Sequence, residues 1–129
     1  MCKVLGVGVD LCAIARMEKV LGDQRFLDRC LTPAEQRYVR GRGLMASASL
    51  AAMWAAKEAA GKALGVGIAL PLTDVEIVHG ETGTPEYALH GQALEMSQGG
   101  RMLLSLSHEG DMAAAFCVWT EGEEKEVSV

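Results

Sequence analysis

An alanine-rich segment between residues 46 and 64 constrains the fold of this chain more than any other part of its sequence. Alanine is the best helix former, and the segment is followed by Gly65, which suits the position after a helix C-terminus. We therefore predict one long helix over 46–64. So many alanines allow close packing against it, which makes it the central element of the fold. Its main apolar stripe comprises Leu50, Met53, the stem of Lys57, Ala60 and Leu64.

Shorter patterns precede this segment. Residues 4–9, VLGVGV, predict a buried strand that ends at Asp10. An apolar stripe from Ala13 to about residue 21 then predicts an amphipathic helix. Residues 32–35, TPAE, have the form of a capping box, so a helix should run from Pro33 to about Arg40.

Two β-hairpins are predicted after the long helix. Their strand pairs are 74–80 with 85–91 and 101–108 with 112–119. A brief helix over 92–98 separates them. We predict a single α+β domain over residues 1–120, with an antiparallel sheet packed on the long helix. A charged tail, 121–129, should be frayed and solvated.

Composition excludes several classes of protein. The chain has 129 residues, which suits one domain, and its formal net charge of -5 argues against a general nucleic-acid binder. The four cysteines form no CxxC pair and the three histidines are too widely spaced for HExxH, so no zinc site is expected. Cys12 and Cys117 should be small buried hydrophobes. The N-terminal apolar run is too short for a signal or membrane segment, so we expect a cytoplasmic protein.

Two carboxylates are candidates for metal binding. Taken singly, Asp10 could be a turn former, and Glu58 with Lys62 could be an ordinary ion pair on a helix surface. The context favours a site, because the long helix is almost uncharged except at Lys57, Glu58 and Lys62. Two carboxylates without histidine or thiolate partners suit Mg²⁺. We predict that Asp10 and Glu58 bind Mg²⁺ and that Lys62 meets the remaining charge of a phosphate.

The glycines after the long helix have two interpretations. Gly65 and Gly67 would let backbone N–H groups approach a phosphate. Equally, they would form a helix C-cap followed by a turn. The sequence leaves both interpretations open.

Three blocks of sequence carry a family resemblance. They are GVGVDLCAIARMEKV, WAAKEAAGKALGVGI and LSLSHEGDMAAAF, in that order. They resemble the conserved blocks of holo-acyl-carrier-protein synthases, the short, trimeric phosphopantetheinyl transferases, and the match covers nearly the whole chain. The resemblance implies a Mg²⁺-dependent transfer of 4′-phosphopantetheine from coenzyme A to a serine of an acyl carrier protein. It also implies release of adenosine 3′,5′-bisphosphate, a homotrimer with shared active sites, and a role in fatty acid or polyketide synthesis.

The resemblance also assigns roles to residues. Glu58 or a metal-bound water would take the serine proton, with Asp10 and Lys62 completing the catalytic group. His108 would lie near the nucleotide end of coenzyme A, although a lone histidine in an apolar strand is otherwise structural. The residues implied to contact coenzyme A are Lys62, Gly65, Gly67, Pro85 and His108.

A basic surface after Asp10 resembles the docking site for the acidic carrier protein. It comprises Arg16 and Arg25, with the apolar Phe26 beside them. Charges of this kind mainly raise the rate of association. The alternative is a solvated face of ordinary basic residues.

The chain departs from the family pattern at three positions. Met53 stands where many members have arginine, Thr84 replaces a basic residue before Pro85, and Met112 replaces an aromatic residue. These changes concern contacts with coenzyme A rather than with metal. Two other functions fit the same residues: a metal-dependent hydrolase of coenzyme A or a nucleotide diphosphate, and a non-catalytic module that docks a carrier protein.

Overall fold

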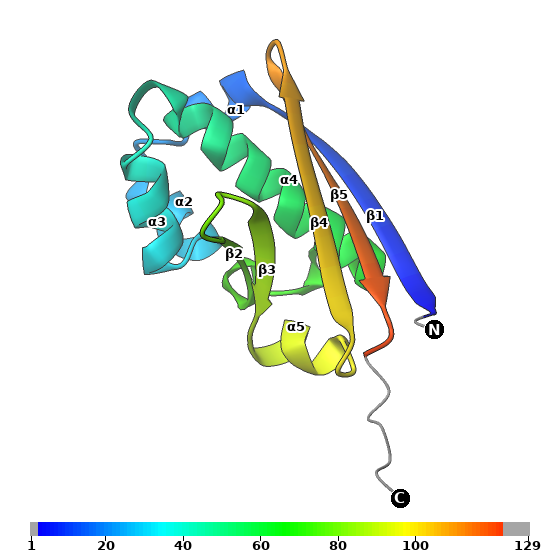
Figure 1. The fold of residues 1–129 in the computed structure, drawn as a ribbon. Coiled ribbons are helices and arrows are strands. Elements are labelled where there is room, and N and C mark those ends of the chain that lie inside the picture. The colour runs from blue at the N-terminus through cyan, green and yellow to red at the C-terminus, as the bar shows by residue number, and fades with distance from the viewer. Residues whose placement is uncertain (1–2, 123–129) are drawn as a thin grey trace, which may run out of the picture.

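The long helix α4 spans Ala46–Leu64, as predicted. The computed structural model describes residues 3–122. Gly65 ends the helix in the left-handed conformation, with φ 79°. The predicted apolar stripe is buried throughout, from Leu50 to Leu64. Figure 1 shows α4 lying across one face of a twisted sheet, where it packs on β1 and β5.

This sheet has three antiparallel strands in the order β1-β5-β4. Its strands are β1 (Val4–Ala13), β4 (Arg101–Glu109) and β5 (Met112–Thr120). The pairing of β4 with β5 confirms the second predicted hairpin and the antiparallel sheet. Cys117 of β5 is fully buried and Cys12 of β1 almost so, as predicted, because both lie on the sheet face that packs against α4.

Strand β1 differs from its prediction in two ways. It does not end at Asp10, which lies inside the strand opposite Ala115. Pairing with β5 continues as far as Ala13, because β5 provides a partner down to Met112. The strand is also buried on one face only, since Val9 on the other face is 56% exposed.

Glycine on the inner face of β1 allows the strand to lie directly against α4. A Cβ atom at Gly8 would collide with the backbone carbonyl oxygen of Ala59, and one at Gly6 with that of Ala63. These neighbours are helix backbone and cannot rotate away. The GVG pattern in this strand therefore serves close packing of strand on helix.

The amphipathic helix predicted from Ala13 to about residue 21 is shorter than expected, since α1 spans Ile14–Glu18. A second helix, α2, follows it over Gln24–Cys30. Helix α2 was not predicted, although Asp23 is a recognisable N-cap whose carboxylate accepts the backbone N–H groups of residues 25 and 26. Helix α3, Pro33–Arg40, begins with the predicted capping box.

The remaining elements flank α4. The first predicted hairpin is confirmed as β2 (Val75–His79) and β3 (Pro85–Leu89), which form a separate two-stranded sheet, and the brief helix is α5 (Gly91–Met96). Three 3₁₀ helices are η1 (Gly43–Met45), η2 (Gly67–Ala69) and η3 (Leu72–Asp74). Of the predicted tail, residues 123–129 lie outside the described part of the chain.

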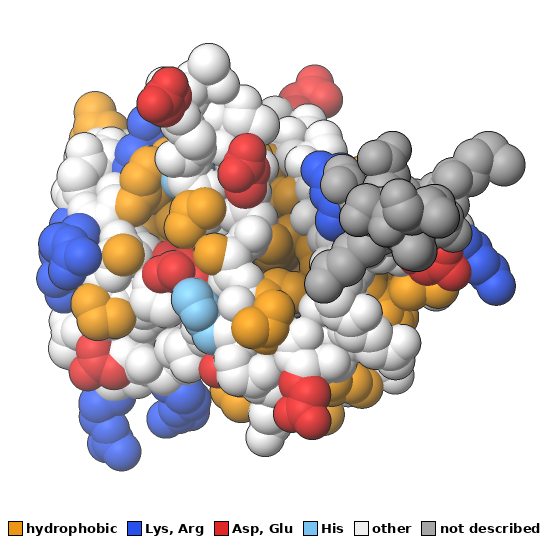
Figure 2. All heavy atoms as spheres, turned by 60° about the horizontal axis from the view of Figure 1, so that its bottom comes forward, with side chains coloured by type: hydrophobic (Ala, Val, Ile, Leu, Met, Phe, Trp, Pro, Cys, Tyr) orange, Lys and Arg blue, Asp and Glu red, His pale blue; other side chains and the backbone are white. Residues whose placement is uncertain are grey.

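Charged side chains are dispersed on the face of the molecule that comes forward in Figure 2. There, neither Lys and Arg nor Asp and Glu form one continuous patch. Within residues 3–122, no helix has both the length and the apolarity to cross a membrane.

One charged side chain of α4 lies in the protein interior rather than in a site. Lys57 and Glu35 form an ion pair of 2.9 Å, and both side chains are fully buried. Burial lowers the pKa of Lys57, and the Glu35 carboxylate opposes that shift. The prediction that Lys57 belongs with Glu58 and Lys62 in one group of site charges was therefore wrong. A buried lysine requires a partner, and here that partner lies on α3.

Candidate active site

Asp10 and Lys62 meet between β1 and α4. The Asp10 side chain lies on the same face of β1 as Gly8 and Cys12, toward the helix. Lys62 Nζ donates to Asp10 Oδ1 at 3.0 Å and to the carbonyl oxygen of Val9 at 2.9 Å. Two elements that are separated by some 50 residues in the sequence thus bring the predicted carboxylate and ammonium into direct contact.

Glu58 lies one helical turn before Lys62 on α4 and faces the same region. Partial burial raises its pKa, the negative charge of Asp10 raises it further, and Lys62 and Arg16 oppose the shift. Because Lys62 bonds Asp10 and Glu58 lies one turn earlier on the same side of α4, both predicted metal ligands border the region between β1 and α4. Their joint binding of a metal stays a prediction.

The donor set fits Mg²⁺. Among residues 3–122, no group of three or more His, Cys, Asp or Glu side chains is arranged to hold a metal ion. An ion bound by Asp10 and Glu58 would take its other ligands from water and substrate. Mg²⁺ is commonly held in this way, by one or two carboxylates together with substrate phosphates. The Lys62 side chain is 52% exposed, so it is free to turn from Asp10 toward an anionic substrate.

Gly65 and Gly67 both have backbone conformations that favour glycine. Their φ angles are 79° and 58°. Helix capping therefore explains Gly65, and the turn explains Gly67, without a ligand. A Cβ atom at either position would meet nothing within 4 Å, so the space above both residues is open. Their contact with coenzyme A stays a prediction.

His108 lines a second part of the molecule, a pocket of about 130 Å³ between α4, β2 and β4. Tyr38, Arg42 and His79 line the same pocket, and sequence analysis missed all three. The Tyr38 and His79 rings stack with centroids 4.0 Å apart, and the Arg42 guanidinium lies 5.6 Å from the Tyr38 centroid. Met53, at a position where many members have arginine, forms part of the wall of this pocket.

The predicted site residues thus fall into two groups within one chain. Asp10, Glu58 and Lys62 form one group, and none of them lines the pocket of His108. Pro85 belongs to the second region, because it begins β3 and pairs with His79.

The predicted docking residues Arg16 and Phe26 meet at Trp54. The Arg16 guanidinium lies 5.2 Å from the centroid of the Trp54 ring, and the Phe26 ring stacks on that ring at 5.7 Å. Arg25 is exposed in the first turn of α2. Sequence analysis did not assign Trp54 to this surface, although its place one turn before Glu58 was a usable signal. The basic surface therefore adjoins the paired carboxylates.

A family model described as the 4′-phosphopantetheinyl transferase superfamily matches residues 6–117. This range contains both carboxylates and every element of the three-stranded sheet except the ends of β1 and β5. The chain belongs to the 4′-phosphopantetheinyl transferase superfamily.

Within that superfamily, the chain falls among the holo-[acyl-carrier-protein] synthases. The synthase of Treponema denticola is 41% identical over 119 residues, covering 89% of this chain and 97% of the relative. The crystal structure of the Neisseria meningitidis synthase has a TM-score of 0.79 at 34% identity and covers 90% of this chain and 98% of that chain. The Bacillus anthracis synthase, solved in complex with CoA (3′,5′-ADP), has a TM-score of 0.80 at 30% identity and covers 92% and 98%.

Proposed function

We propose that this protein transfers 4′-phosphopantetheine from coenzyme A to a serine of an apo acyl carrier protein and releases adenosine 3′,5′-bisphosphate. The observation that carries the proposal is the contact of Lys62 with Asp10, one helical turn from Glu58 on α4, in a chain that matches holo-[acyl-carrier-protein] synthases over most of its length. A structural relative binds CoA (3′,5′-ADP), which supports coenzyme A as the co-substrate. We place the enzyme in the cytoplasm.

In this reaction a new bond forms between the serine oxygen and the phosphorus that carries pantetheine. The bond from that phosphorus to the departing adenosine bisphosphate breaks. Bound Mg²⁺, held by Asp10 and Glu58, would neutralise charge on the pyrophosphate. Lys62 would turn from Asp10 and donate to a phosphate oxygen. Glu58, or a water bound beside it on the metal, would accept the serine proton.

The proposal is tested by incubating the protein with Mg²⁺, coenzyme A and an apo carrier protein. The mass of the carrier should rise by one phosphopantetheine group, and a carrier whose acceptor serine is replaced by alanine should gain nothing. Release of adenosine bisphosphate without any carrier would instead identify a hydrolase. Metal-independent binding of the carrier without transfer would identify a docking module.

The surface of Arg16, Arg25, Phe26 and Trp54 is the proposed docking site for the carrier. Reversing one exposed charge there, Arg25→Glu, should raise the KM for an acidic carrier about fivefold and leave kcat unchanged. Steady-state kinetics at low and high salt measure the effect, which should shrink as salt screens the charge. Arg101→Glu at the exposed start of β4 is the matched control. Equal effects of both changes would show that only net charge matters.

The outer face of the three-stranded sheet supports self-association, which we propose to be the trimer. Its most exposed apolar side chains lie on the face opposite α4 and are 46% to 62% exposed in one chain: Val7, Val9, Leu11, Leu103 and Phe116. An exposed apolar patch of this kind usually marks an interface. The separation of His108 from Glu58 within one chain also agrees with active sites that are completed by a second chain.

Introducing a charge at the centre of this face should dissociate the oligomer. Val9 lies opposite Phe116 in the sheet, so Val9→Glu would place a carboxylate among apolar side chains. Light scattering coupled to size exclusion should then report the mass of one chain. The control, Leu94→Glu, changes an equally exposed apolar residue on α5 and should leave the mass unchanged. A Val9→Glu protein that kept the wild-type mass would exclude this face as the interface.

A further inference from the structure

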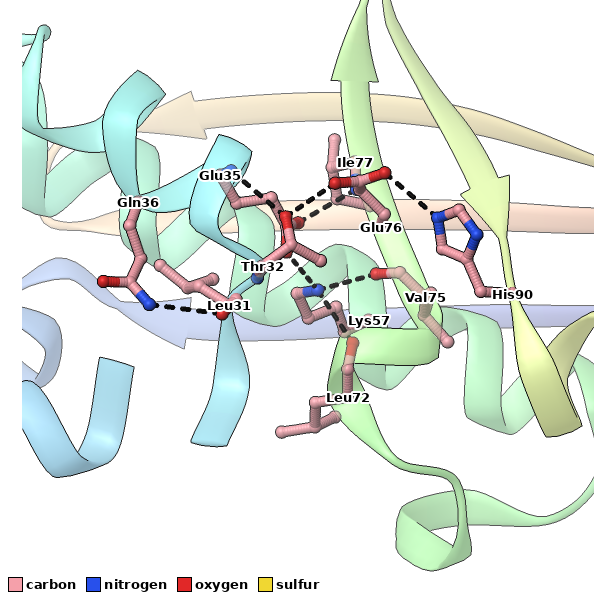
Figure 3. Close-up of polar contacts among 10 residues, drawn as sticks. All are labelled: Leu31, Thr32, Glu35, Gln36, Lys57, Leu72, Val75, Glu76, Ile77 and His90. Carbon is pink, nitrogen blue, oxygen red and sulfur yellow. Dashed lines mark hydrogen bonds and ion pairs between the residues drawn. The ribbon is translucent and has the colours of Figure 1, made fainter. Parts of the chain in front are cut away.

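The ion pair between Lys57 and Glu35 has no part in the reaction described so far, yet it uses every hydrogen-bonding group that Lys57 offers. The three donors of the ammonium match three acceptors: Glu35 Oε1 at 2.9 Å and the backbone carbonyl oxygens of Leu72 at 2.8 Å and Val75 at 2.7 Å. Figure 3 shows the Lys57 ammonium between these groups. Its position is therefore fixed from three sides.

Glu35 is held just as firmly. Its Oε1 accepts the backbone N–H of Thr32 at 2.9 Å, and its Oε2 accepts the backbone N–H of Ile77 at 2.9 Å. The pair thus ties the middle of α4 to the first turn of α3, to η3 and to β2 (Figure 3).

Lys57 immediately precedes Glu58 on α4. Consecutive residues of an α-helix point about 100° apart, so Lys57 faces α3 and β2 while Glu58 faces the side of Asp10. A rotation of the helix that moved Glu58 would have to break the hydrogen bonds of Lys57. On its other side the helix cannot move toward β1, because Gly8 of β1 already lies against the backbone of Ala59.

Stability alone is a poor explanation for this pair. An apolar pair of similar volume is often as stable as a buried ion pair, or more stable, because it carries no desolvation penalty. An apolar pair would, however, fix helix rotation less strictly, since its contacts are not directional.

We propose that Lys57 is a positioning residue whose ion pair with Glu35 sets the rotation of α4 and thereby the distance between the metal-binding carboxylates of Glu58 and Asp10. The inference rests on the proposed metal site. It predicts that the pair controls metal affinity, although neither residue touches the metal.

The test uses the double substitution Lys57→Met with Glu35→Gln. It removes both charges, so no unpaired charge is left in the interior. The glutamine oxygen can still accept one of the two backbone N–H groups that Glu35 binds, and its amide nitrogen can donate toward a carbonyl oxygen that Lys57 leaves. The control is Leu50→Ala, which removes buried packing two turns earlier on α4 without touching the ion pair. Circular dichroism sets the assay temperature below the unfolding transition of every variant.

Mn²⁺ binding, followed through the electron paramagnetic resonance of the free ion, is the primary readout and does not depend on turnover. In the double variant the Kd for Mn²⁺ and the KM for Mg²⁺ should each rise about 10-fold or more, as when groups that orient metal ligands are removed. The KM for the carrier should change little, and Leu50→Ala should leave both metal constants within about twofold.

Two results would overturn the positioning role. One is a double variant that binds Mn²⁺ as tightly as the wild type. The other is an equal loss of affinity in Leu50→Ala, which would indicate general loosening of the helix. A wild-type protein that binds no Mn²⁺ would overturn the metal site itself, and the positioning role with it.

Discussion

Replacing Glu58 by glutamine is expected to lower kcat by on the order of 10²- to 10³-fold, the largest loss of activity that we predict from a single substitution. Glutamine has nearly the same shape, but it carries no charge for a metal and cannot act as a base at neutral pH. Initial rates of carrier modification at saturating Mg²⁺ and coenzyme A measure the effect. Glu86→Gln, on the exposed side of β3, is the matched control and should turn over normally. Unchanged turnover in Glu58→Gln would contradict its role in catalysis.

The same substitution should stabilise the metal-free protein at neutral pH. The folded-state pKa of Glu58 is raised, so the native state favours the protonated carboxyl. At pH values above that pKa, the ionised carboxylate destabilises the native state relative to the unfolded chain. Glutamine removes this cost, and Tm should rise. The difference from the wild type should vanish as pH falls below the ordinary value of 4.5, where Glu58 is protonated in both states.

Gly8→Ala should produce the largest loss of stability, about 3 kcal/mol or more. The new Cβ atom would overlap the carbonyl oxygen of Ala59 and press on the backbone nitrogen of Ala63. Since both are helix backbone and cannot rotate away, β1 would have to move away from α4. The free energy of unfolding from urea titration measures the loss. Gly22→Ala is the control, because nothing lies within 4 Å of a Cβ atom there, and its stability should be unchanged or slightly higher. Equal unfolding midpoints for the two variants would contradict the close approach.

Local signals predicted most of the fold correctly. The alanine-rich stretch indicated the bounds of α4, the capping box indicated the start of α3, and short apolar runs joined by turn residues located both hairpins. The extent of β1 was wrong because its end depends on β5, about 100 residues later in the chain. Helix α2 was missed because the apolar stripe of 14–21 ends at Gly22, and the capping signal of Asp23 after that break was not used.

The candidate site was predictable where a family resemblance supplied the pairing. Nothing in local sequence brings Asp10 to Glu58, because that proximity arises from the packing of β1 on α4. The misplacement of Lys57 has the same origin, since its partner Glu35 lies on a different element. The pocket of His108 is built from side chains of α3, η1, α4, β2 and β4, so no single stretch of sequence marks it.

Strand β1 presents opposite chemistry on its two faces, with Gly8 and Asp10 toward α4 and Val9 and Leu11 outward. Insertion or deletion of one residue before Gly8 would exchange these faces if the pairing with β5 were kept. Valine would then meet the helix backbone where only glycine fits, and Asp10, the proposed metal ligand, would point outward. Single substitutions of the outer residues leave this alternation of inward and outward side chains unchanged. We therefore expect the strand to accept changes of outward side chains far more readily than any change in its length.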